Sequence, residues 1–172
     1  MLAWSQPSSL APARAACVLE WSASKLGVRE LTGRNDGPEI DAWQRAAGAA
    51  LRGPWCGVYQ AAGQRHCGLP YPKGAAGSYN WFLAGSPRTY FIKGVRGSLD
   101  SLRPGHHVGF YYANMRRVAH IGRAVAPARK RGNRGWYCNE GNTGSGGGRD
   151  GAGVHLLLRA NWEFHAAANW ID

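Results

Sequence analysis

The order of residue patterns along the chain is the feature that most limits its fold. Residues 10–27 carry apolar side chains at helical intervals, and Pro38 and Pro54 each stand near the expected start of a further helix. The pattern then changes to short β-prone runs, at residues 89–93, 107–112, 118–125, 135–140 and 154–159. Because helices come first and strands follow without βαβ alternation, we predict an α+β fold with N-terminal helices packed on a mostly antiparallel β-sheet.

The size of the chain indicates one domain. A length of 172 residues with 44% hydrophobic residues suits a single domain over residues 1–172. No apolar run approaches the roughly 20 residues of a membrane-spanning helix. Residues 1–12 lack the charged start and apolar stretch of a secretory signal, so we expect cytoplasmic synthesis without a signal peptide. The cysteines show no zinc-type spacing, and we expect unpaired thiols at all four positions, Cys17, Cys56, Cys67 and Cys138.

The charge is strongly basic and unevenly distributed. The net charge is +11, and residues 42–172 hold seventeen basic side chains against five acidic ones. Seven basic residues and no acidic one lie in the segment 116–134. Such a segment favours a polyanionic partner, for which nucleic acid, teichoic acid, lipopolysaccharide and the anionic cell wall are candidates. The simpler alternative is a basic surface that only keeps the protein soluble.

Cys56 is the strongest candidate for a reactive side chain. It follows the Gly53-Pro54 break and stands in the first turn of a predicted helix. The free N–H groups and the partial positive charge of a helix N-terminus favour thiolate, which is the nucleophilic form of cysteine. The same N–H groups could hold an oxyanion. The alternative is a buried structural cysteine.

His120 is the histidine best placed to act as the base that a thiolate enzyme needs. It lies in the middle of a predicted strand among apolar and small residues. His106 and His107 follow a Pro-Gly turn, and we expect both at the surface. The alternative for His120 is a half-buried structural role.

Two polar residues could orient the imidazole of His120. Glu140 is the only acidic residue between positions 100 and 150, and it lies near the end of a predicted strand. A carboxylate in such a place can hold the imidazole and stabilise its cation, as in catalytic triads. Asn142 is two residues further on and shares that face if the strand continues. An ordinary turn is the alternative for this segment.

This order, with a helix-borne cysteine, then a strand-borne histidine, then a polar residue on the next strand, is that of papain-like cysteine hydrolases. Four segments resemble one branch of them, the CHAP domains (cysteine, histidine-dependent amidohydrolase/peptidase). The segments are GVRELTGRNDGPEI at 27–40, PWCGVY at 54–59, RVAHIG at 117–122, and EGNT at 140–143 with RDGAGV at 149–154. The resemblance covers roughly residues 10–160.

The resemblance implies a papain-like fold and a peptidoglycan hydrolase. Such proteins are endopeptidases or N-acetylmuramoyl-L-alanine amidases, and many are phage endolysins. It implies Cys56 as nucleophile, His120 as base, and Glu140 or Asn142 as the orienting residue. Acyl transfer by these groups requires no metal or other cofactor.

The chain departs from the family pattern at two places, and it also contains a group of acidic residues at which a metal ion could bind. Family members usually carry aspartate after the Pro-Gly turn, where this chain has His106, and small residues after the nucleophile, where Gly57 is followed by bulkier ones. A Ca²⁺ ion could bind near three acidic residues, although we favour helix capping as their role. These residues are Asp36, Glu39 and Asp41.

The substrate and partners follow from the same interpretation. We expect Trp55, Tyr79 and Trp81 to line a substrate groove, with core packing as the alternative. The expected partner is bacterial peptidoglycan, which a monomer would reach after release or export from the cell. A second interpretation is an exported antibacterial effector with the same chemistry, paired with an immunity protein. A nucleic-acid-binding module is the third and is disfavoured, because it leaves the Cys/His/Glu order unexplained.

Overall fold

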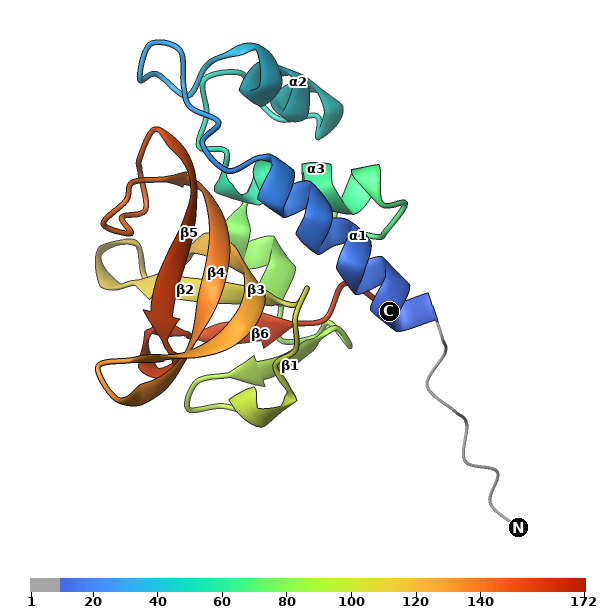
Figure 1. The fold of residues 1–172 in the computed structure, drawn as a ribbon, viewed down its shortest axis with the longest axis vertical. Coiled ribbons are helices and arrows are strands. Elements are labelled where there is room, and N and C mark those ends of the chain that lie inside the picture. Colours follow the sequence, from blue (N-terminus) through green and yellow to red (C-terminus); the bar gives the residue numbers. More distant parts are fainter. Residues whose placement is uncertain (1–9) are drawn as a thin grey trace.

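Three helices precede a single β-sheet in the computed structural model of the chain, which describes residues 10–172 (Figure 1). The helices are α1 (Leu10–Ser24), α2 (Pro38–Ala46) and α3 (Cys56–His66). Helix α2 ends before the expected residue 51, because Gly48 takes a left-handed conformation with φ of 62°. Among residues 10–172, no helix has the length and apolar character needed to cross a membrane.

The sheet has six strands, and every neighbouring pair is antiparallel. The spatial order is β1-β6-β2-β3-β4-β5. The strands are β1 (Thr89–Ile92), β2 (His107–Tyr112), β3 (Arg117–Lys130), β4 (Asn133–Thr143), β5 (Gly153–Ala160) and β6 (Ala166–Ala168). Strand β6 was not expected, because three alanines carry no β-propensity signal; it forms by pairing with both β1 and β2. The predicted α+β class is confirmed.

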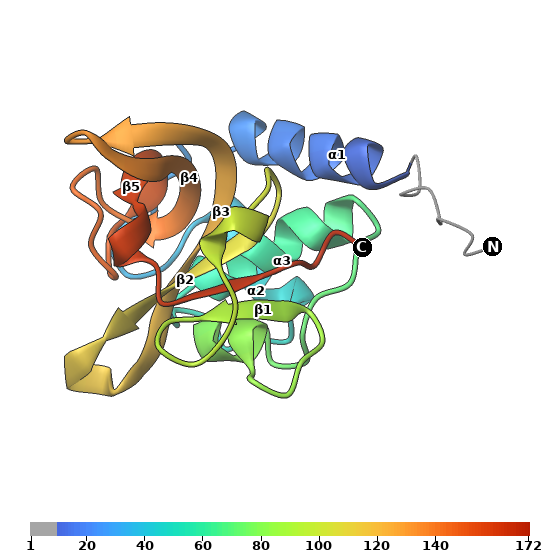
Figure 2. The ribbon, with the colours of Figure 1, turned by 90° about the horizontal axis from the view of Figure 1, so that it is seen from below.

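Helix α3 is the central helix of the fold. It packs against β3 and β4 on one side and has α1 and α2 as its other neighbours (Figures 1 and 2). Trp55, Val58 and Tyr59 are fully buried in the cluster that fills the space between the helices and the sheet. The start of α3 is therefore held rigidly against the strands that carry His120 and Glu140.

A disulfide between Cys17 and Cys67 ties α1 to the end of α3. The two Cα atoms lie 6.0 Å apart, and 50 residues separate the cysteines in the chain. The expectation of four unpaired thiols was therefore wrong, because the sequence does not show that these two helices are neighbours. Cys56 and Cys138 are free and buried. Stable disulfides are typical of oxidising compartments outside the cytoplasm.

The histidines after the Pro-Gly turn are not surface residues, contrary to expectation. His107 is fully buried, and its ring lies 4.5 Å from that of Trp81. Burial holds the pKa of His107 well below its usual value. His106 is half-buried, and its Nδ1 lies 3.1 Å from the hydroxyl of Tyr90. Strand β2 continues directly from the turn into the core, which draws both rings inward.

The basic segment 116–134 does not form one continuous charged surface. Arg123 points into the protein and is fully buried. Lys130 and Arg134 each form an ion pair with an acidic side chain, at 2.8 and 2.9 Å. A polyanion would therefore meet fewer free charges here than the sequence indicates.

Candidate active site

Cys56 is the first residue of α3, as the Gly-Pro break predicted. The first regular helical hydrogen bond runs from the Tyr59 amide to the Trp55 carbonyl at 2.8 Å. The amides of the three residues before Tyr59 therefore have no acceptor within the helix and are available at the thiol. Cys56 is only 3% exposed, and its sulfur lies 3.2 Å from the Ser78 hydroxyl oxygen.

Gly57 lets a neighbouring loop approach the start of α3. A Cβ atom at this position would lie 2.2 Å from the carbonyl oxygen of Ala75, which no side chain can tolerate. The indole N–H of Trp81 donates to the same carbonyl at 2.9 Å and fixes the loop. The loop then places Ser78 beside the thiol. A small residue after Cys56 is thus required by the packing of this structure.

His120 and Glu140 come from the neighbouring strands β3 and β4. Nε2 of His120 lies 2.8 Å from Oε2 of Glu140, and both side chains are fully buried. Gly122 makes this contact possible, because a Cβ atom there would lie 2.8 Å from Cγ of Glu140. The Nδ1 atom of His120 forms no hydrogen bond of regular geometry within residues 10–172, although the imidazole interacts with the Cys56 thiol.

Arg159 holds the carboxylate from its other side. Its Nε donates to Oε1 of Glu140 at 2.8 Å, and its Nη2 donates to Oε2 at 2.6 Å. Its guanidinium also lies 4.6 Å from the ring centre of Phe110. The sequence analysis did not select Arg159. One signal in the sequence could have identified Arg159, which is a basic residue near the end of an apolar predicted strand. Such a residue can pair with the carboxylate of Glu140, the only acidic residue between positions 100 and 150.

The charges of these groups favour an ionised site. Burial raises the pKa of the Cys56 thiol, but the interaction with His120 outweighs burial and brings this pKa below its usual value. Burial lowers the pKa of His120, but Cys56 and Glu140 together raise it to about 9. Burial raises the pKa of Glu140, while Arg159 and His120 lower it by more. At neutral pH these directions favour a thiolate, an imidazolium and a carboxylate.

Asn142 serves a different purpose from Glu140 and does not contact His120. Its Oδ1 accepts a hydrogen bond from the Trp55 amide at 3.0 Å, and its Nδ2 donates to the Gly151 carbonyl at 3.0 Å. Its backbone is left-handed with φ of 57°, so the regular strand alternation fails before this residue. Asn142 therefore holds the start of α3, and Glu140 is the residue beside the imidazole.

Two of the three aromatic residues expected in a substrate groove are core residues instead. Trp55 and Trp81 are fully buried, and the indole N–H of Trp55 donates to Glu30 at 2.9 Å. A substrate cannot reach either ring. Tyr79 is 43% exposed and lines a pocket at the thiol. Trp81 points inward with Ser78, because a 3-10 helix has three residues per turn and the helix Ser78–Phe82 therefore turns both residues to the core.

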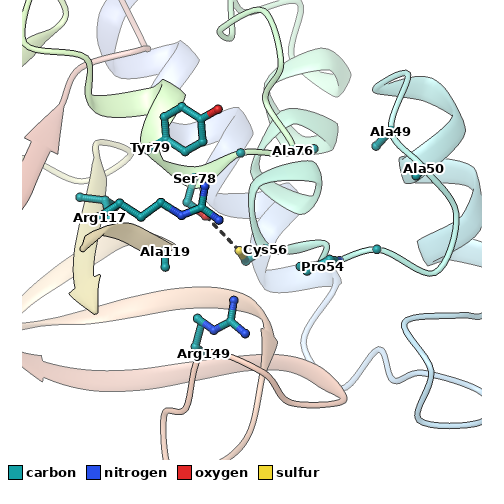
Figure 3. Close-up of a pocket in the computed structure, with 13 residues that line it drawn as sticks. Ala49, Ala50, Pro54, Cys56, Ala76, Ser78, Tyr79, Arg117, Ala119 and Arg149 are labelled. Carbon is teal, nitrogen blue, oxygen red and sulfur yellow. Dashed lines mark hydrogen bonds between the residues drawn. The ribbon is translucent and has the colours of Figure 1, made fainter. Parts of the chain in front are cut away.

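The pocket at Cys56 is a hollow of about 310 Å³ (Figure 3). It lies between the start of α3, the 3-10 helix and the first residues of β3. Arg117 and Arg149 are the two charged residues that line it. The thiol is therefore open to a small group or a short stretch of chain.

The acidic residues near α2 are engaged with other side chains. Asp36 accepts hydrogen bonds from the Thr32 amide at 3.0 Å and from Arg52 at 2.7 Å, and the Thr32 amide is the main cause of its lowered pKa. Glu39 pairs with Lys25 at 2.9 Å. Within residues 10–172, no three acidic, histidine or cysteine side chains are grouped as metal ligands.

No protein-family model, curated protein or solved structure matches this chain. The fold and the site define an α+β protein with a buried Cys56–His120–Glu140 arrangement beside an open pocket.

Proposed function

We propose that this chain is a cysteine-dependent peptidoglycan hydrolase of the papain-like, CHAP-like type. The observation that carries the proposal is a buried thiol at the start of α3 together with a buried imidazole whose Nε2 lies 2.8 Å from the buried Glu140 carboxylate, and the pKa of each of the three groups is shifted toward its charged form. Charged groups are costly to bury without a function or a partner. Here the partners are one another and Arg159.

The proposed reaction is acyl transfer. The Cys56 thiolate attacks the carbonyl carbon of an amide, and the free N–H groups at the start of α3 hold the resulting oxyanion. His120 gives its proton to the leaving amine, which departs as the thioester forms. His120 then accepts a proton from water, which attacks the thioester and releases the acid. Glu140 orients the imidazole and stabilises its cation, while Arg159 keeps Glu140 ionised.

The assignment to cell-wall peptide rests on three further features. Four segments of the sequence resemble CHAP domains. The Cys17–Cys67 disulfide suits a protein that works in an oxidising environment. The basic excess of residues 42–172 favours the anionic envelope. An endolysin and an exported antibacterial effector share all three features. A nucleic-acid-binding module would leave the buried His120–Glu140 pair and the adjoining Cys56 without a role, which counts against that alternative.

Digestion of purified peptidoglycan tests the proposal. We expect soluble fragments that carry one new amino group and one new carboxyl group for each cut, and mass analysis of the fragments identifies the amide that is cleaved. The same preparation is offered together with DNA at equal charge. A strong preference for DNA, with no fragment released from any wall preparation, would favour the binding module instead.

The pH dependence of wall hydrolysis should report the proposed ion pair. We expect the rate to fall as the pH rises through about 9, because His120 then loses the proton that the leaving amine needs. A Glu140→Gln variant removes the carboxylate that favours the imidazolium, so its alkaline limb should move to lower pH. Glu163→Gln is the matched control, because Glu163 contacts Arg159 at 3.4 Å without touching His120. Identical profiles for the three proteins would contradict the role of Glu140.

A further inference from the structure

The pocket at Cys56 has a cationic wall. Arg117 lies at the start of β3, and Arg149 lies in the loop between β4 and β5. Figure 3 shows their side chains extending from two sides toward Cys56. Aspartate and glutamate are absent from the described residues that line the pocket. A ligand at the thiol therefore meets two guanidinium groups and no carboxylate.

Within the described part of the chain, Arg117 contacts an aromatic ring and has no acidic partner. Its guanidinium carbon lies 5.3 Å from the ring centre of Tyr79, within the range of a cation–π contact. Across residues 10–172, it forms no ion pair. A guanidinium in a cation–π contact can still donate through its N–H groups, whose geometry matches the two oxygens of a carboxylate.

Arg149 forms an ion pair with an acidic residue that lies outside the pocket. It contacts Asp150, whose side chain is 58% exposed and is not among the residues that line the pocket. The Arg149 side chain is 28% exposed and does line the pocket. Together the two arginines and Asp150 leave a net charge of +1 beside the thiol.

One further wall of the pocket is small and apolar. It is formed by Ala49, Ala50, Gly53 and Pro54, which lie between α2 and α3. A volume of about 310 Å³ is at the lower end of the range for small-ligand sites. Such a pocket holds one or two residues of a peptide, so an anion bound to its arginines belongs close to the amide at Cys56.

We propose that the pocket selects substrates that carry a free carboxylate on a residue next to the scissile amide, with Arg117 and Arg149 binding that carboxylate. This inference rests on the proposed amide hydrolysis and deepens it. In wall peptide the carboxylate has two possible sources: the α-carboxylate of a glutamate linked through its side chain, or the C-terminal carboxylate of the peptide. A carboxamide has the same shape as a carboxylate but carries no charge. Replacing a substrate carboxylate with a carboxamide therefore tests whether the pocket recognises the charge.

Four synthetic peptides test the proposal by binding. The N-acetylated peptide L-Ala-γ-D-Glu-L-Lys-D-Ala is made with each of its two carboxylates either free or converted to carboxamide. Calorimetric titration uses the Cys56→Ala variant, which retains the pocket and cannot cleave. We expect one of the two carboxylates to improve Kd by about tenfold or more, as for a charge-assisted hydrogen bond. The pair of peptides whose Kd values differ identifies which of the two carboxylates the pocket binds.

Two variants separate local recognition from general charge. In the Cys56→Ala background, Arg117→Gln should reduce the carboxylate preference by about tenfold, and Arg149→Gln should reduce it by several-fold. Arg116→Gln is the matched control, because Arg116 is exposed, adjacent and outside the pocket. An equal loss of preference in Arg116→Gln would mean that long-range charge is responsible and would overturn the proposal.

Wild-type cleavage of the same peptides and of whole wall distinguishes the two proposals. Binding of all four peptides within twofold, together with cleavage of wall, would overturn the carboxylate site and leave the hydrolase intact. A clear carboxylate preference without cleavage of any wall preparation would support the site and remove the proposed reaction. Cleavage that follows the binding preference supports both.

Discussion

A Cys56→Ser variant is expected to keep its fold and lose nearly all hydrolysis of peptidoglycan. The hydroxyl is smaller than the thiol and should fit the same buried position beside Ser78. Its pKa is far higher than that of a thiol, so His120 cannot hold it ionised. We expect the rate to fall by about 10⁴-fold or more, as for removal of the nucleophile in other hydrolases. The measurement is fragment release from purified wall, with thermal unfolding recorded on the same samples.

Cys138→Ser is the matched control for this substitution. Cys138 is the second free and buried cysteine, and burial raises the pKa of its thiol well above the usual value. It lies on β4, where its sulfur is 3.9 Å from the Trp136 carbonyl oxygen, so it should remain a thiol and take no part in the reaction. We expect this variant to be less stable and to retain its rate within a few-fold. A wild-type rate in Cys56→Ser, or a complete loss in Cys138→Ser alone, would contradict the assignment of the nucleophile.

Removal of the Cys17–Cys67 disulfide is expected to have the largest effect on stability. The bond closes a loop with a sequence separation of 50 residues. In the chain-entropy model, a loop of this length stabilises the folded state by about 4 kcal/mol. For a chain of this size, that loss lowers Tm by about 10 °C. The Cys17→Ser/Cys67→Ser double variant should show this shift in thermal unfolding under non-reducing conditions.

Reductant and thiol titration provide the controls. Dithiothreitol should lower the Tm of the wild-type protein toward that of the double variant and should leave the double variant unchanged. Denatured wild-type protein should show two titratable thiols, from Cys56 and Cys138. Four titratable thiols in protein prepared under oxidising conditions would show that the bond does not form.

Local patterns in the sequence predicted the order of the elements and the place of the nucleophile. Helix periodicity and the prolines at 38 and 54 indicated where α2 and α3 begin, because proline is favoured at a helix start. The aromatic and β-branched runs indicated five of the six strands. These are properties of neighbouring residues, which a single sequence displays directly. The same reasoning placed Cys56 at a helix N-terminus.

Contacts between distant residues decided the remaining features of the site. Asn142 could not be distinguished from Glu140 by spacing, because its left-handed backbone interrupts the alternation of side chains on β4. Arg159 reaches Glu140 only because β5 pairs with β4.

The sequence by itself therefore determined the α+β class, the order of helices and strands, and the candidate residues Cys56 and His120, with Glu140 and Asn142 as alternatives for the third position. The tertiary structure alone decided β6, the Cys17–Cys67 bond and the Arg159 contact. The physical reason is the distance along the chain over which each kind of interaction acts. Propensity and periodicity act over a few residues, whereas strand pairing and helix packing join segments that the sequence keeps far apart.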